Sequence, residues 1–180
     1  MKATGIVRRI DDLGRVVIPK EIRRTMRIRE GDPLEIYTEK DGEVIFKKYS
    51  PIGELANFSA QICDSLHKTT DCTTIVCDRD SVISVAGSTK REFQDKRVSQ
   101  ELEQIMAGRK VYQYERGSTL KYVLEGDEKN HLSVAAPILS EGNVLGCVVF
   151  ASSKNDPVAG EIELKLAQTV AGFLGKQMES

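Results

Sequence analysis

Apolar and polar positions alternate in two short stretches at the start of the chain, before Ile10 and again from Arg15 to Ile18. Alternation at a period of two is typical of β-strands, so the pattern predicts strands over residues 2–10 and 15–18, with a turn at Leu13-Gly14. Pro19 stands where a helix can begin, because the first helical position tolerates its missing N–H. The spacing of Ile22 and Met26 predicts a helix over 20–27 with both side chains on one buried face.

Two more strands are predicted over residues 34–39 and 43–49. The Asp41-Gly42 pair between them is typical of a tight hairpin turn whose two central residues both have φ > 0. The apolar side chains of this hairpin are expected on its buried faces: Leu34, Ile36, Val44 and Phe46. A module of about 50 residues buries only about 60% of its unfolded surface, and its strand edges are open. Both points predict a dimer of intertwined hairpins.

The pattern changes after Tyr49-Ser50-Pro51, which we take as a domain boundary between residues 1–50 and 51–180. Helical spacing is found over 52–66, 98–106 and 158–178. Strands are predicted over 73–77, 82–86, 111–114, 120–124, 132–139 and 144–151. Antiparallel strands with helices gathered on them indicate an α+β domain. We expect the helices over 52–66 and 162–174 to lie side by side and to form a helix-bundle interface that joins dimers into a tetramer.

The formal charge of −1 conceals a basic N-terminus. Residues 1–29 hold nine Lys or Arg and three Asp or Glu, whereas residues 51–180 hold 14 and 18. Such asymmetry indicates an anionic partner, although a charged, solvated face is the simpler alternative. Guanidinium groups pair with phosphate or with a guanine edge at two points. Alternatively, the arginines of residues 1–29 form salt bridges with Asp11, Asp12 or Glu21.

Several function classes have weak support. No apolar run approaches the roughly 20 residues of a membrane span, and no charged-then-apolar leader follows Met1, so we expect a cytoplasmic protein without membrane contact. The four cysteines (Cys63, Cys72, Cys77 and Cys147) lack metal-ligand spacing and are expected to be reduced core residues. A phosphate-binding loop with Lys and Ser or Thr is missing, and the two histidines are far apart. We therefore expect neither an enzyme nor a metal or cofactor site.

Residues 1–49 closely resemble the DNA-binding domain of the AbrB family, the transition-state regulators of spore-forming bacteria. The shared text is Gly5-Ile6-Val7-Arg8, Leu13-Gly14-Arg15-Val16-Val17-Ile18-Pro19-Lys20-Glu21-Ile22-Arg23-Arg24, Gly31-Asp32 and Leu34-Glu35-Ile36-Tyr37. The resemblance implies an all-β swapped-hairpin fold that dimerises and binds double-stranded DNA. In that family the arginines matching Arg8, Arg15, Arg23 and Arg24 carry the DNA contacts. Arg27 stands where the family often has Gly.

The second half resembles the GAF domain that sporulation members of this family carry. The segments 133–138 and 144–150 look like the paired central strands of a GAF sheet. GAF sensors hold ligands between the sheet and the segment that here spans about 88–129. The Asn-Lys-Phe-Asp-Glu set of cyclic-nucleotide GAF domains is missing, so the ligand is left open, and a purely oligomerising role is the alternative.

These patterns together predict a sequence-selective DNA-binding transcription regulator of the sporulation type. One alternative is a GAF-type small-molecule sensor or redox enzyme whose arginines only solubilise the N-terminus. Another is an antitoxin resembling the MazE type, which shares the N-terminal fold. The folded pattern after Pro51 argues against the disordered tail with which antitoxins usually embrace a toxin.

Overall fold

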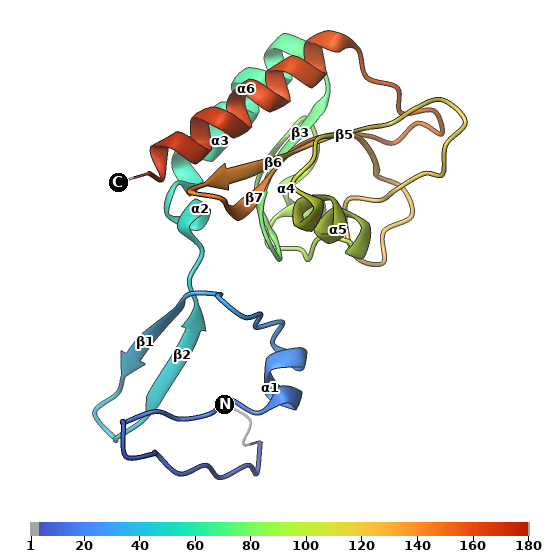
Figure 1. The fold of residues 1–180 in the computed structure, drawn as a ribbon. Coiled ribbons are helices and arrows are strands. Elements are labelled where there is room, and N and C mark those ends of the chain that lie inside the picture. Colours follow the sequence, from blue (N-terminus) through green and yellow to red (C-terminus); the bar gives the residue numbers. More distant parts are fainter. Residues whose placement is uncertain (1–3, 180) are drawn as a thin grey trace. The chain divides into compact units, whose positions relative to one another are not determined.

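The computed structural model describes residues 4–179. Within it the chain forms two compact units, residues 1–49 and 50–180, each of which is considered by itself (Figure 1). The first unit holds the helix α1 (Lys20–Thr25) and a hairpin of β1 (Leu34–Thr38) and β2 (Val44–Lys48). The second unit is an α+β structure built on a five-stranded antiparallel sheet.

The turn of the β1–β2 hairpin differs from the expected two-residue turn. Glu39 N–H donates to Glu43 O at 3.0 Å and Gly42 N–H donates to Glu39 O at 3.1 Å, which encloses a loop of residues 40–42. Gly42 has φ 83°, whereas Asp41 is not among the residues with positive φ. A three-residue loop with glycine in the left-handed position is the next most common hairpin connection, and it shifts the register by one residue relative to a two-residue turn.

The two strands predicted before α1 are wrong for the single chain. Residues 4–10 and 15–18 belong to no strand or helix, Gly5 has φ 70°, and residues 2 and 3 lie outside the described part. The physical reason is that a strand requires a neighbour for its hydrogen bonds, and the β1–β2 hairpin pairs only with itself in the first sheet. The turn between the two segments does form, with Gly14 N–H donating to Asp11 O and Asp11 N–H to Arg15 O.

Apolar side chains of the first unit are exposed to an unusual extent. The exposed fraction is 86% for Val7 and 71% for Val17. The hairpin positions expected to be buried are also open in the single chain, with Ile36 at 61%, Val44 at 58% and Phe46 at 40%, whereas Leu34 is half-buried. The helix face predicted from Ile22 and Met26 is not buried either, since α1 holds no buried residue. A unit this small has too little interior to cover these groups.

The second unit runs from helices into the sheet and back to a helix. In chain order its elements are α2 (Pro51–Glu54), α3 (Ala56–Thr70), β3 (Thr73–Asp78), β4 (Val82–Ala86), α4 (Lys90–Phe93), α5 (Gln100–Gly108), β5 (Tyr112–Gln113), β6 (His131–Ser140), β7 (Asn143–Ser152) and α6 (Glu161–Gln177). The strand order in the sheet is β4-β3-β7-β6-β5. The segment 120–124, expected as a strand, makes only single bridges, Tyr122 to His131 and Leu124 to Val98.

Helices cover both faces of the sheet and create two cores. On one face α3 and α6 lie side by side, as expected, and Phe58 contacts Phe173 with ring centroids 5.9 Å apart (Figure 1). Phe150 and Leu174 are fully buried in that core. On the other face α4 and α5 enclose a second core around Phe93 and Leu102. This division places α3 and α6 on the face of the sheet opposite α4 and α5.

A glycine in α6 allows the helix to lie close against the sheet. A Cβ placed on Gly175 would stand 2.1 Å from the carbonyl oxygen of Leu139 in β6, which is far inside van der Waals contact. Gly172 on the same helix has open space around its Cα. The closeness of α6 to the sheet therefore depends on one glycine and not on the other.

Gly175→Ala is expected to destabilise the second unit by about 1–3 kcal/mol, because the methyl group forces α6 away from β6. Gly172→Ala is the matched control and should raise stability by about 0.5–1 kcal/mol, since alanine is the better helix former and meets no neighbour. Urea unfolding of the full chain measures both. Equal effects of the two substitutions would contradict this account of the helix position.

Candidate nucleic-acid interface

The structure places the four predicted DNA-contacting arginines on the surface of the first unit. Arg8 lies in the irregular segment before the first turn, Arg15 follows that turn, and Arg23 and Arg24 lie in the last turn of α1. All four side chains are exposed. Their presence on three consecutive segments of one small unit supplies planar, permanently charged forks that suit phosphate oxygens.

Arg15 also makes the salt bridge that was the alternative use of the arginines. Its Nε lies 2.8 Å from Asp11 Oδ2, and the Arg15 backbone N–H donates to Asp11 Oδ1 at 2.8 Å. The backbone hydrogen bond from Arg15, with its side-chain hydrogen bond second, lowers the pKa of Asp11. Because 70% of the Arg15 side chain remains exposed, the bond fixes one edge of the guanidinium and leaves its other N–H groups at the surface.

The end of α1 is closed by a backbone motif that sets the direction of the chain after Arg24. Ile28 N–H donates to Arg23 O at 2.8 Å and Arg27 N–H donates to Arg24 O at 3.2 Å. These two bonds define a Schellman cap, in which Arg27 takes a left-handed conformation with φ 52°. Glycine is the usual residue in this conformation, which explains why the AbrB family often has Gly at this position. Arg27 adopts the same conformation at some cost in backbone energy.

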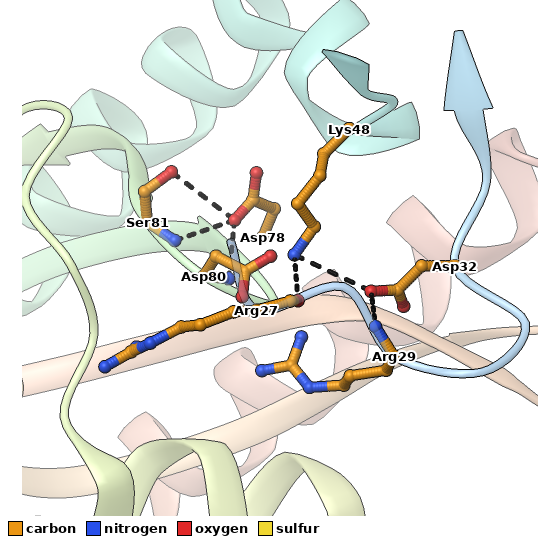
Figure 2. A network of polar contacts seen from close by, with 7 residues as sticks. All are labelled: Arg27, Arg29, Asp32, Lys48, Asp78, Asp80 and Ser81. Atoms are coloured by element: carbon orange, nitrogen blue, oxygen red, sulfur yellow. Dashed lines mark hydrogen bonds and ion pairs between the residues drawn. The ribbon is translucent and has the colours of Figure 1, made fainter. Parts of the chain in front are cut away.

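Lys48 connects this cap to the hairpin (Figure 2). Its Nζ donates to the carbonyl oxygen of Arg27 at 2.8 Å and lies 3.6 Å from Asp32 Oδ2. The same carboxylate oxygen accepts the Arg29 backbone N–H at 2.8 Å, and only 5% of the Asp32 side chain is exposed. Charge-assisted bonds of this kind are stronger than neutral ones. They tie the helix that carries Arg23 and Arg24 to β2.

The acidic turn of the second unit is structural. Asp78 Oδ1 accepts the backbone N–H groups of Asp80 at 2.8 Å and Ser81 at 2.7 Å, and lies 3.5 Å from the Ser81 hydroxyl (Figure 2). An aspartate that closes a turn in this way needs no other ligand. No group of three or more His, Cys, Asp or Glu side chains converges on a metal-ion site in residues 4–179.

The interior expected to hold a GAF ligand is filled by apolar side chains. Phe93, Val98, Leu102, Val123 and Leu132 are all fully buried between the sheet and the segment 88–129. A polar cavity of about 680 Å³ opens beside this core instead. It is lined by Thr73, Gly87, Ser88, Arg91, Glu92, Lys96, Arg97, Leu124, Glu125, Gly126, Asp127, Lys129, Asn130 and Ser153.

The basic residues of this cavity were not singled out by the sequence. Arg91, Lys96 and Arg97 lie within seven residues of one another, whereas Lys129 is distant along the segment 88–129, and the four follow no motif. The available signal was the charged, poorly periodic character of the segment itself. The fold brings them together because α4, the loop before α5 and the loop before β6 meet beside the ends of β3 and β7.

None of the helices described between residues 4 and 179 is both long and apolar enough to span a membrane. Two family models match the chain. Residues 54–179 match the model described as stage V sporulation protein T C-terminal, transcription factor. Residues 7–53 match the model described as antidote-toxin recognition MazE, bacterial antitoxin.

The chain is similar to several proteins of known sequence or structure. Stage V sporulation protein T of Bacillus subtilis is 50% identical over 179 residues, which cover 99% of each chain. The N-terminal DNA recognition domain of the Bacillus subtilis regulator AbrB is 63% identical, covers 28% of this chain and 94% of that domain, and has a TM-score of 0.25. Sequence identity alone carries this second match.

The third is a type II free methionine-R-sulfoxide reductase from Thermoplasma acidophilum. It is 12% identical, has a TM-score of 0.55 and covers 71% of this chain and 94% of that one. At this identity the likeness concerns the fold of the second unit alone. A GAF domain of a phosphoenolpyruvate-protein phosphotransferase from Coxiella burnetii, 16% identical with a TM-score of 0.51, covers 69% of this chain and 82% of that one. The expected α+β GAF fold and the AbrB-like N-terminal region are thus both confirmed, and the chain belongs to the family of stage V sporulation protein T.

Proposed function

We propose that this protein is a DNA-binding transcription regulator of sporulation, working in the cytoplasm. The observation that carries the proposal is the set of four exposed arginines, Arg8, Arg15, Arg23 and Arg24, on a unit 63% identical to a DNA recognition domain. Residues 1–50 form the DNA-binding domain, and residues 51–180 form the GAF domain. With so few arginines per subunit, phosphate contacts and DNA shape supply most of the affinity, and base reading is modest.

The first unit works as a dimer with swapped hairpins. Val7, Val17, Ile36 and Val44 leave more than half of their side-chain surface open in one chain. Val7 and Val17 lie in the segments 4–10 and 15–18, which belong to no sheet and offer backbone groups for strand pairing. A second copy of the chain supplies hydrogen-bond partners for these backbone groups, and the strand pairing between the chains also buries the apolar side chains. The dimer then presents eight arginines.

Assembly into a tetramer uses the outer surface of α3 and α6. Ile162 and Phe173 of α6 are 68% and 45% exposed, Phe58 of α3 is 36% exposed, and Leu166 lies between the two α6 residues along the helix. Their spacing places them in one apolar stripe, whereas Gln168 stands on a polar face of the same helix. An apolar stripe on two adjacent helices suits a four-helix interface with a second copy.

The second unit also senses a small molecule. The support is the polar cavity of about 680 Å³, which falls in the size range of ligand pockets. A ligand that changes the arrangement of the GAF domains would change the spacing of the DNA-binding dimers, and by linkage DNA would alter ligand affinity by the same factor. The linker at Tyr49-Ser50-Pro51 is short, which favours such coupling.

The redox-enzyme alternative is disfavoured by the state of the cysteines. Burial raises the pKa of Cys63 to about 12 and the pKa values of Cys77 and Cys147 well above their usual range. Burial likewise raises the pKa of the half-buried Cys72. Because the thiolate is the reactive form, these thiols are poor nucleophiles at neutral pH. The antitoxin alternative is disfavoured by the folded unit that follows residue 50.

Salt should weaken DNA binding steeply. If half of the eight arginines of a dimer neutralise phosphates, a plot of log affinity against log salt should have a slope of about −3 to −4. Arg24→Gln should reduce the magnitude of that slope by about 2, because the change occurs in both protomers. The exposed Arg109→Gln in the second unit is the control and should leave the slope unchanged. Fluorescence anisotropy of a labelled duplex provides the measurement, and salt-independent affinity would refute the proposal.

Lys48→Met should weaken duplex binding about 5- to 30-fold, since the loss of a charge-assisted bond worth about 1–2 kcal/mol loosens α1. The control Lys47→Met removes an equal charge from the neighbouring position, where Nζ only covers the Tyr37 ring at 4.4 Å. Hydrogen exchange of the α1 and hairpin amides should accelerate in Lys48→Met alone. If both variants lose affinity equally, Lys48 acts through its charge and not through the position of α1.

Phe173→Asp should convert the wild-type tetramer into dimers, because it places a charge in the α3–α6 interface at a cost of several kcal/mol. Gln168→Asp adds the same charge on the polar face of α6 and should leave the tetramer intact. Multi-angle light scattering measures the particle mass. A wild-type monomer at micromolar concentration would contradict both the dimer and the tetramer.

A further inference from the structure

The polar cavity of the second unit contains more basic than acidic side chains. Arg91, Lys96, Arg97 and Lys129 face three carboxylates, Glu92, Glu125 and Asp127, among its lining residues. All four basic residues are exposed, and no ion pair joins any of them to a carboxylate within residues 4–179. The cavity therefore holds four cationic groups whose charges are not neutralised by a bonded partner.

Local hydrogen bonds already occupy two of the carboxylates. Asp127 accepts the Lys129 backbone N–H at 2.8 Å and the Asn130 side-chain amide at 2.6 Å, which closes the turn before β6. Glu92 Oε2 accepts the Ser88 hydroxyl at 3.3 Å. These contacts hold the Glu92 and Asp127 carboxylates in their own loops, whereas the four basic side chains are exposed.

The walls of the cavity are set by ordered backbone. Arg97 O accepts Glu125 N–H at 3.1 Å, and Gly87 and Gly126 have positive φ values of 81° and 74° at the rim. Gly87 also lacks room for a Cβ, which would stand 2.6 Å from His67 Nδ1. A mouth built from such segments keeps its shape and needs little rearrangement to receive a ligand.

The chemistry of the lining decides the ligand class. Two guanidinium groups and two ammonium groups around a polar space favour an anion with several charged oxygens, because guanidinium binds phosphate at two points and ammonium adds point charges. The filled apolar core beside the cavity excludes a ligand that buries a hydrocarbon side chain there. Phosphate groups satisfy the cations, and a single carboxylate would leave most of them unpaired.

We propose that the cavity lined by Arg91, Lys96, Arg97 and Lys129 binds a small molecule with two or more phosphate groups. This inference rests on the sensing role proposed above for the second unit and names the class of its ligand. The site lies at the edge of the segment 88–129, beside the core and not within it.

The test uses inorganic pyrophosphate as the probe and isothermal titration calorimetry of the full chain at fixed ionic strength. The wild-type protein should bind one pyrophosphate per chain, more tightly than acetate by at least tenfold. Arg91→Gln with Arg97→Gln should weaken this binding at least tenfold, and Lys96→Gln with Lys129→Gln should do so independently. The matched control, Lys90→Gln with Lys110→Gln, removes two exposed charges outside the cavity and should change the affinity less than twofold.

Two further measurements identify other origins of the binding. If Arg23→Gln with Arg24→Gln abolishes pyrophosphate binding while the cavity variants retain it, the probe binds the DNA surface and the proposal is overturned. If Arg91→Gln with Arg97→Gln lowers duplex affinity tenfold in the absence of pyrophosphate, the cavity cations belong to the DNA interface, which also overturns it.

Absence of pyrophosphate binding at millimolar concentration overturns the ligand class. Duplex binding by the wild-type protein is scored separately. A protein that binds DNA but not pyrophosphate loses only this inference, whereas one that binds pyrophosphate but not DNA loses the proposed regulatory function.

Discussion

The small interior of the first unit is the constraint on which its organisation depends. A compact unit of 49 residues has too much surface for its volume, and Val7, Val17 and Ile36 stay open to water in one chain. The hydrophobic effect therefore favours association over any rearrangement within the chain. In the proposed dimer the same association completes the sheet and brings the arginines of two chains onto one particle. The proposed dimer thus gains stability and a nucleic-acid surface in a single event.

The second unit, in contrast, buries two hydrophobic cores of its own. Helices cover both faces of its sheet, and the two faces differ in their packing. The α3–α6 face is held close to the sheet by Gly175 and offers an apolar stripe outward. The α4–α5 face has a filled apolar core, and a polar cavity opens beside it. The proposed assembly surface and the proposed ligand site are therefore separate surfaces of one domain.

Sequence patterns predicted the elements that depend on local periodicity. The α3–α6 pair and the β6–β7 hairpin follow from apolar spacing and turn residues. The strands before α1 do not form in one chain, since β1 and β2 pair only with each other in the first sheet. The loop of residues 40–42 was misjudged because Asp-Gly pairs occur in both two- and three-residue turns.

The candidate sites differ in the same way. Arg23 and Arg24 are adjacent in sequence and stand on one short helix, so their grouping was visible beforehand. Arg91 and Lys129 come together only through the tertiary fold, and spacing alone gives no hint of it. The Lys48 bond to the Arg27 carbonyl is equally invisible in the sequence, because it joins residues that are distant along the chain.

The contact between α3 and α6 has a consequence for the order in which a newly made chain can fold. Phe58 lies in the first long helix of the second unit, whereas its neighbour Phe173 is translated nearly two thirds of the chain later. The first unit leaves the ribosome well before the sheet of the second can be covered. Since chains fold from the N-terminus as they emerge, hairpin exchange between nascent chains can precede closure of the second unit. Two nascent chains on neighbouring ribosomes of one messenger RNA could then form the proposed dimer.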